Sequence, residues 1–250
     1  TITGSGARTL ALSGTNTLDV VSDSTLPGGG FVLNLSGVPT LTSSNVSGAT
    51  LTNSGSGLSL TSATINASLA ISNPGGATVT FANVTDNGAF ANSGTLTIPN
   101  GTASTLNGTV TNANTGTIQV VNGANGATLT VANGFTNAGL IDLQNGGGNP
   151  TTFTLNAGTL TNSGTVRASG AGGGGVTLSG ALTNTSTGTL DVLHSLAVTN
   201  ALRTLDLSAG TLNLATGQTL AVTDGTTKIG GGTTITGSGA RTLALSGTNT

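Results

Sequence analysis

The chain has 250 residues, of which 35% are hydrophobic, and it contains no cysteine, methionine, tryptophan or tyrosine. Five lysines and arginines stand against seven acidic residues, all of them aspartate, which leaves a net charge of −2. The charge excludes a basic nucleic-acid-binding surface, the absence of cysteine excludes disulfides and thiolate metal sites, and no apolar run reaches the roughly 18–20 residues of a membrane-spanning helix.

The first seventeen residues, Thr1 to Thr17, recur unchanged as Thr234 to Thr250, at an offset of 233 residues. An identical segment of this length predicts that the sequence covers just over one period of a longer tandem array. A catalyst rarely needs an identical copy of itself joined head to tail, whereas a fibre or a stalk does. No composition shift marks a boundary, so we expect residues 1–250 to form one continuous domain.

The segment before residue 51 is hard to register, because Pro27 to Gly30 indicates a loop among irregularly placed leucines. From residue 51 a phrase recurs: an apolar residue, a small residue and Asn, followed after a short turn by Gly and a second apolar residue. Apolar residues alternate with Thr and Ser between the turns, as in strands with one buried face. The marker asparagines, 19–25 residues apart, are Asn53, Asn73, Asn92, Asn112, Asn137, Asn162 and Asn184.

A period near 20–25 residues with this alternation predicts an all-β fold, a parallel β-helix (β-solenoid) of about 20–25 residues per coil. Equivalent residues of successive coils would then stack about 4.8 Å apart. We expect each marker Asn at a corner, in a left-handed backbone conformation and bonded to the Asn above and below, with Gly at the other positive-φ corners. One inner column would hold Leu51, Ile71, Phe90, Val110, Phe135, Leu160 and Leu182, and a second Val79, Leu96, Ile118, Ile141, Val166 and Leu190.

Three charged residues occupy the same phrase position, directly after the second apolar column. Asp142, Arg167 and Asp191 would alternate in sign down one outer face. We expect either a short ion-pair ladder, worth roughly 0.2–1 kcal/mol per exposed pair, or three unrelated solvated charges.

The segment around residues 202–222 keeps the alternation without the Asn phrase, so its register stays open. No pair of the scattered aspartates suggests a catalytic acid and base, and His194 has no second histidine near it. We therefore predict no enzyme activity, no metal site and no cofactor. The five phenylalanines fall at inward positions and are predicted to belong to the core.

The Asn-x-Gly-x-apolar phrases in coils rich in Thr, Ser and Gly resemble the large repeat adhesins of bacteria. These include filamentous-haemagglutinin-like proteins and autotransporter passengers, and the resemblance covers about Leu51 to Val192. It implies a right-handed parallel β-helix at the bacterial cell surface or outside the cell. No binding residue of that family has a matching position in this chain.

These observations predict a structural extracellular fibre or adhesin shaft that mediates attachment, aggregation or matrix formation. Its partners would be adjacent copies of the same repeat, stacked end to end, and other cells, surfaces or polysaccharide, but neither nucleic acid nor a membrane. Two alternatives remain open. One is an ice- or surface-binding module, because Thr-x-Thr ranks recur, and the other is a filament of separate, self-assembling subunits.

Overall fold

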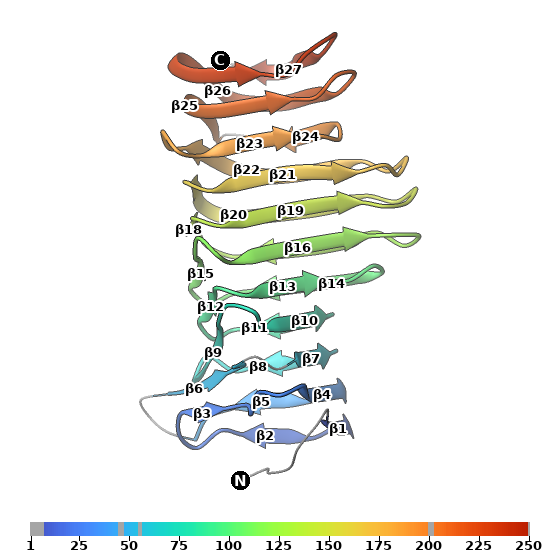
Figure 1. The fold of residues 1–250 in the computed structure, drawn as a ribbon, viewed down its shortest axis with the longest axis vertical. Helices are drawn as coiled ribbons and strands as arrows, with labels where there is room; N and C mark the ends of the chain where they lie inside the picture. The colour runs from blue at the N-terminus through green and yellow to red at the C-terminus, as the bar shows by residue number, and fades with distance from the viewer. Residues whose placement is uncertain (1–7, 45–47, 55–56, 200–202, 250) are drawn as a thin grey trace.

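The computed structural model describes residues 8–44, 48–54, 57–199 and 203–249, and within these ranges all regular structure is β-strand. The strands wind as a parallel β-solenoid of about 10 turns. In Figure 1 the coils lie on one another along the longest axis, with β1 to β3 at one end and β26 and β27 at the other. The first part of the first repeat copy, Thr1 to Ala7, and Thr250 lie outside the described residues.

The strands form three faces, each a ladder in which a strand pairs with its equivalents one coil below and one coil above. Face A consists of β1 (Arg8–Gly14), β4 (Phe31–Gly37), β7 (Gly57–Thr61), β10 (Thr78–Ala82), β13 (Thr95–Ile98), β16 (Thr117–Asn122), β19 (Leu140–Asn145), β21 (Thr165–Gly170) and β23 (Thr189–Val192). Face B consists of β2 (Thr17–Asp19), β5 (Thr40–Thr42), β8 (Thr64–Ile65), β11 (Thr85–Asp86), β14 (Thr102–Leu106), β17 (Ala127–Val131), β24 (Leu196–Thr199) and β27 (Thr242–Asn249). Face C consists of β3 (Ser24–Thr25), β6 (Ala49–Thr52), β9 (Leu69–Asn73), β12 (Phe90–Asn92), β15 (Val110–Asn112) and β18 (Phe135–Asn137).

Four long strands bend round a corner and contribute to more than one face. Both β20 (Thr151–Asn162) and β22 (Val176–Asn184) pass from face B to face C. Strand β25 (Thr204–Leu214) passes from face C to face A, and β26 (Thr219–Thr236) crosses faces B, C and A in turn. The corners therefore open progressively toward the β27 end.

The alternation of apolar residues with Thr and Ser explains why these segments are strands. Successive side chains of a strand point to opposite sides, so the apolar half of each strand is buried and the hydroxyl half faces outward. On face A the buried residues pair like over like, from Val79 over Leu58 to Leu190 over Val166. Coils of face A are 17 residues long between Val79 and Leu96 and 25 residues between Ile141 and Val166. Loops at the corners absorb this difference, so the inner columns stay in register.

Both predicted inner columns are present in the core. The column that begins at Leu51 lies on face C and the column that begins at Val79 lies on face A, and every member is at most 7% exposed. All five phenylalanines are buried, as predicted, and two pairs meet with tilted rings at centroid distances of 5.6 Å and 6.4 Å. Burial of apolar area is the main stabilising term of such a core.

The two copies of the repeated segment lie on different faces. Leu10 of the first copy stacks under Leu33 on face A, in the column that ends at Ile235. Leu243, its counterpart in the second copy, stacks on Leu220 on face B. The 233-residue offset therefore spans a whole number of coils plus one face.

Candidate functional site: an asparagine ladder and the outer faces

The marker asparagines form an unbroken ladder of side-chain hydrogen bonds through seven coils. Each Nδ2 group donates to the Oδ1 atom of the next asparagine, at distances between 2.6 and 3.0 Å. Asn53, Asn73, Asn92, Asn112, Asn137, Asn162 and Asn184 are all 3% exposed or less. The ladder runs inside the solenoid, at the end of the face C strands.

Each ladder asparagine also ties its coil to the backbone of face A. Asn92 Nδ2 donates a second hydrogen bond to the Thr117 carbonyl at 3.0 Å, and Asn162 Nδ2 donates to the Thr189 carbonyl at 3.0 Å. A buried carboxamide without partners would destabilise the fold by about 1–3 kcal/mol. The repeat places an identical group directly above and below, which satisfies both ends of the amide.

The predicted left-handed backbone at these asparagines is wrong. In the described ranges the non-glycine residues with positive φ are Ser62, Asn83 and Asp224. Each ladder residue instead ends or directly follows a strand and points its side chain inward, so its backbone stays extended. The turn is made by the residues that follow.

The glycines of the phrase also have a different role from the predicted one, because they permit close approach rather than positive φ. A Cβ atom on Gly164 would lie 2.1 Å from the Gly139 carbonyl oxygen, and one on Gly139 would lie 2.1 Å from the Gly116 oxygen. Any side chain there would collide with the backbone of the coil below. Glycine is thus required by the spacing between coils.

Apolar residues close the ladder at both ends. Leu26 precedes Asn53 in this column and Leu207 follows Asn184, and both leucines are buried. The Oδ1 atom of Asn53 is buried without a hydrogen-bond partner. The ladder therefore changes abruptly from amide stacking to aliphatic stacking.

The three predicted charges stack in register on face A but form one ion pair rather than two. Arg167 Nε lies 2.8 Å from Asp191 Oδ2. Asp142 is bonded instead to Ser169 Oγ at 2.6 Å and to Gln144 Nε2 at 2.8 Å. Two neutral donors within reach of Asp142 thus replace the arginine of the coil above.

Sequence reasoning missed a buried acid on face B. Asp86 is fully buried between Ile65 of the coil below and Leu106 of the coil above. Its Oδ1 atom accepts a hydrogen bond from the Gly88 N–H at 2.9 Å, whereas Oδ2 has no partner. Burial raises the pKa of Asp86 to about 7, because a charged carboxylate is poorly solvated in this core. A Thr-Asp dipeptide in a strand gives no sequence signal for such a position.

A second pair of buried asparagines lies at the opposite corner, between faces A and B. Asn122 and Asn145 stack in register, and Asn145 Nδ2 donates to the Gly175 carbonyl at 3.3 Å. Asn122 Oδ1 accepts from the Gly126 N–H at 3.1 Å. The Asn-Gly dipeptides at 122–123 and 145–146 were the available signal.

The outer surface of face B carries a hydroxyl residue on every coil. This column contains Thr17, Thr40, Thr64, Thr85, Thr105, Thr130, Thr154, Ser179, Thr199, Thr223 and Ser246. The corresponding outer column of face A is interrupted by Gln119, Asp142 and Arg167. Face B is therefore the more uniform of these two outer surfaces.

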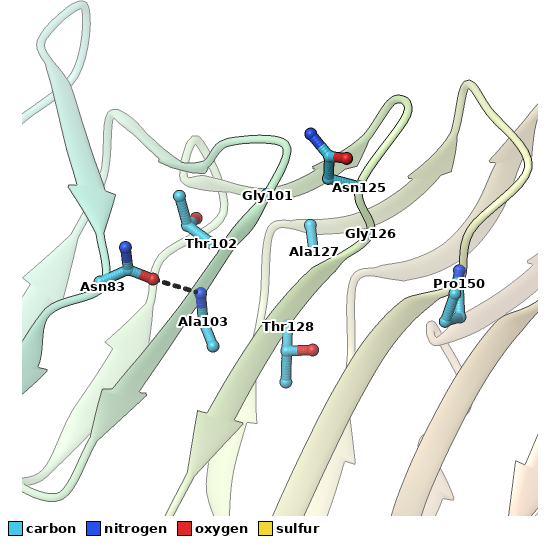
Figure 2. Close-up of a pocket in the computed structure, with 9 residues that line it drawn as sticks. All are labelled: Asn83, Gly101, Thr102, Ala103, Asn125, Gly126, Ala127, Thr128 and Pro150. Atoms are coloured by element: carbon cyan, nitrogen blue, oxygen red, sulfur yellow. Dashed lines mark hydrogen bonds between the residues drawn. The ribbon is translucent and has the colours of Figure 1, made fainter.

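A small open depression of about 290 Å³ lies beside face B, where the loops of three coils meet (Figure 2). Asn83 Oδ1 there accepts a hydrogen bond from the Ala103 N–H at 3.0 Å, which joins two coils. Its remaining lining is Gly, Ala, Thr, Pro and Asn125, so no ionisable group faces the depression. It offers neutral polar contacts but neither an acid nor a base.

The described ranges contain no cluster of three His, Cys, Asp or Glu residues that would suit a metal ion. They also contain no helix long and apolar enough to cross a membrane. Asp19 and Asp23 accept backbone hydrogen bonds from Ser44 and Thr50 of the coil above, at 2.9 and 2.8 Å. These two carboxylates thus act as links between coils.

The chain was compared with known proteins at the level of families, sequences and structures. No protein-family model matches it, and neither a curated protein nor a solved structure matches it.

Proposed function

We propose that this chain is a segment of a structural extracellular fibre or adhesin shaft. The observation that carries the proposal is the asparagine ladder, which joins seven successive coils through buried amide hydrogen bonds from Asn53 to Asn184. A stack of coils bonded only to its neighbours is a quasi-one-dimensional element that holds its two ends apart. That is a mechanical role, and it needs no catalytic group.

Three further features support a role outside the cell, on or near the surface of a bacterium. The chain contains no cysteine, and five lysines and arginines in 250 residues leave trypsin-like proteases few sites. Its coils resemble the repeat adhesins of bacteria. Attachment to cells, surfaces or polysaccharide would belong to other parts of such a fibre.

Antibodies against this chain test the proposal directly. We expect immunogold particles on filaments of intact, unpermeabilised cells, and denaturing electrophoresis separates the two ways of building them. A band far larger than 23.7 kDa indicates a covalent array, whereas a band near that mass indicates separate subunits. Label found only after permeabilisation contradicts an extracellular shaft.

The hydroxyl column of face B favours a second candidate, a surface- or ice-binding module. Eleven coils each contribute one outward Thr or Ser to this column, and charge does not interrupt it. A second rank of Thr accompanies it only at Thr128, Thr152 and Thr177, because the later coils carry Ala197 and Ala221 instead. A thermal-hysteresis assay of the chain decides this candidate, and Thr130→Asp and Thr154→Asp should remove any activity found.

A further inference from the structure

The repeated heptad Arg-Thr-Leu-Ala-Leu-Ser-Gly forms an edge strand at each end of the solenoid. The first copy is β1 (Arg8–Gly14), and the second lies at 241–247 and includes most of β27. Within the described ranges β1 pairs with β4 alone and β27 pairs with β26 alone. The two strands thus lie at opposite ends of the stack (Figure 1), and each leaves one edge open.

The open edge of β27 is the edge that β1 uses to bind β4. The Arg8 N–H donates to the Gly30 carbonyl, on the β4 side, at 3.4 Å. The Thr242 N–H donates at 3.1 Å to the Gln218 carbonyl, on the opposite side, and Thr242 is the counterpart of Thr9. N–H groups of neighbouring residues in a strand point to opposite edges. The two copies therefore share one alternation, and β27 presents to solvent the donors and acceptors with which β1 holds β4.

The side chains lead to the same conclusion. Leu10 lies under Leu33 in the first copy, while Leu243, the same residue of the heptad, lies on Leu220 in the second. Superposing the two copies gives an uninterrupted column of leucines through the junction. The heptad has one neighbour in each place and would have both in a joined stack.

Both ends leave inward-facing leucines uncovered. Leu10 and Leu243 are each 37% exposed and Leu245 is 52% exposed, whereas Leu33 and Leu220 of the adjoining coils are 4% and 0% exposed. Covering such residues removes apolar surface from water, which is the dominant favourable term in association. An identical strand also replaces β1 without any loss of local contacts, as in low-cost domain swapping.

We propose that a second copy of this chain docks on the β27 end, where β27 takes the place of the incoming copy's β1 beneath its β4. Ala244 then lies beside Asn34 of the incoming copy, as Ala11 lies beside Asn34 within one chain. This inference rests on the proposed shaft function and specifies the junction. In a covalent array the same strand belongs to both repeats, and the same contacts arise without displacement.

The junction turns each copy by one face. Because β27 lies on face B and β1 on face A, face A of the incoming copy continues face B of the first. Three copies bring the faces back into phase. The hydroxyl column of face B therefore changes sides at every junction, and the shaft presents each feature on all three sides. A single long binding plane, which a surface- or ice-binding array needs, does not arise.

Cysteine pairs in the otherwise cysteine-free chain test the junction. Neighbouring parallel strands lie about 4.8 Å apart, within the Cα–Cα range in which disulfides form. We expect Asn34→Cys with Ala244→Cys to give an interchain disulfide ladder on non-reducing gels when concentrated chain is oxidised. Ala11→Cys with Thr236→Cys reports the unturned alternative, in which face A of one copy follows face A of the other, and should give no ladder.

A third variant tests the displacement of β1. Ala11→Cys with Asn34→Cys, oxidised at low concentration, locks β1 onto β4 within one chain. We expect the locked chain to remain monomeric by size-exclusion chromatography and to assemble again on reduction. Ladders from the Ala11/Thr236 pair overturn the turned junction but leave the shaft intact. A wild-type chain that is monomeric at every concentration overturns the strand exchange, while immunogold labelling still decides the shaft function.

Discussion

The middle and the ends of this solenoid solve the same packing problem with different side chains. Between Leu51 and Val192 the corner beside face C is filled by amides that bond only to identical amides above and below. Outside that range the same position is occupied by Leu26 and Leu207. An aliphatic group packs on any apolar neighbour, whereas an amide requires its own kind, so the ladder makes the middle coils interdependent and leaves the ends adaptable.

Strict stacking also fixes the glycines of the middle coils, and breaking it there should have the largest effect. We expect Gly139→Ala to destabilise the chain by more than about 4 kcal/mol, in the range of severe core disruption, because its Cβ atom would lie 2.1 Å from the Gly116 oxygen. Hydrogen exchange should show lost protection in the coils around residue 139 and retained protection far from it.

Gly148→Ala is the matched control for that change. Gly148 lies in a loop of a neighbouring coil, and a Cβ atom there meets nothing within 4 Å. We expect its free energy of unfolding to stay within about 0.5 kcal/mol of the parent chain. Equal effects of the two substitutions would contradict the role assigned to the spacing between coils.

Asp86 is the polar core residue of the middle that lacks a like neighbour, and it should make stability depend on pH. Its folded pKa is raised from 3.8 to about 7, so the folded chain holds a proton that the unfolded chain releases. Stability is then fully present below pH 4 and declines by about 4 kcal/mol as pH rises to about 7. Urea unfolding at several pH values measures the slope.

Asp86→Asn separates this carboxyl from the other titrating groups. The amide keeps the acceptor for the Gly88 N–H and carries no charge, so the decline between pH 4 and 7 should vanish. The variant should be more stable than the parent at pH 8 and should differ little at pH 4. An unchanged slope would assign the pH dependence to another group.

The sequence predicted the fold and the columns of the middle coils because its signal there is periodic. The spacing of the marker asparagines and the alternation around Leu96 and Ile118 determined which residues stack. The register of residues 1–50 and 193–233 stayed open, because the corner residue there is leucine and any leucine fits the pattern. Structure placed Leu33 and Leu41 inside and left Val38 63% exposed.

Features that depend on single neighbours escaped prediction. The burial of Asp86 depends on Ile65 and Leu106, residues 21 and 20 positions away, whose register had no marker. The backbone of the ladder asparagines was mispredicted because Asn favours left-handed turns in general. Here the amide ladder holds the side chain inward at the end of a strand.

The ladder itself should be more sensitive in its middle than at its last member. Asn137→Asp replaces the amide that donates to Asn162 Oδ1 at 2.8 Å and to the Thr165 carbonyl at 3.1 Å. Asn184→Asp removes only a 3.3 Å bond to the Thr211 carbonyl. We expect losses of about 3 kcal/mol and about 1 kcal/mol respectively, because a buried carboxylate facing acceptors lacks compensation.

Measurement at two pH values checks the cause of that difference. The carboxyl group that Asn137→Asp introduces can donate again once it is protonated, so the destabilisation should shrink as pH falls toward 4. A simple shape defect would cost the same at both pH values. If the two substitutions were equally costly at pH 7, stacking of like amides would not be what distinguishes the middle from the end.

The smallest expected effect concerns the charges of face A, where the middle coils tolerate variety. Arg167 pairs with Asp191 at 2.8 Å, and its side chain is 36% exposed, so solvent screens the interaction. A double-mutant cycle with Arg167→Gln and Asp191→Asn should give a coupling of about 0.5–1 kcal/mol at low salt. The coupling should fall toward zero near 1 M salt, where the Debye length is about 3 Å.

The same cycle with Asp142→Asn in place of Asp191→Asn is the control. Asp142 is bonded to Ser169 and Gln144, so its coupling to Arg167 should be close to zero. Equal couplings would restore the continuous ion-pair ladder that sequence alone suggested. Unequal couplings would mean that outer columns, unlike the inner amides, need no continuity from coil to coil. Because inner continuity alone holds the stack, the outer faces are then free to vary along the shaft.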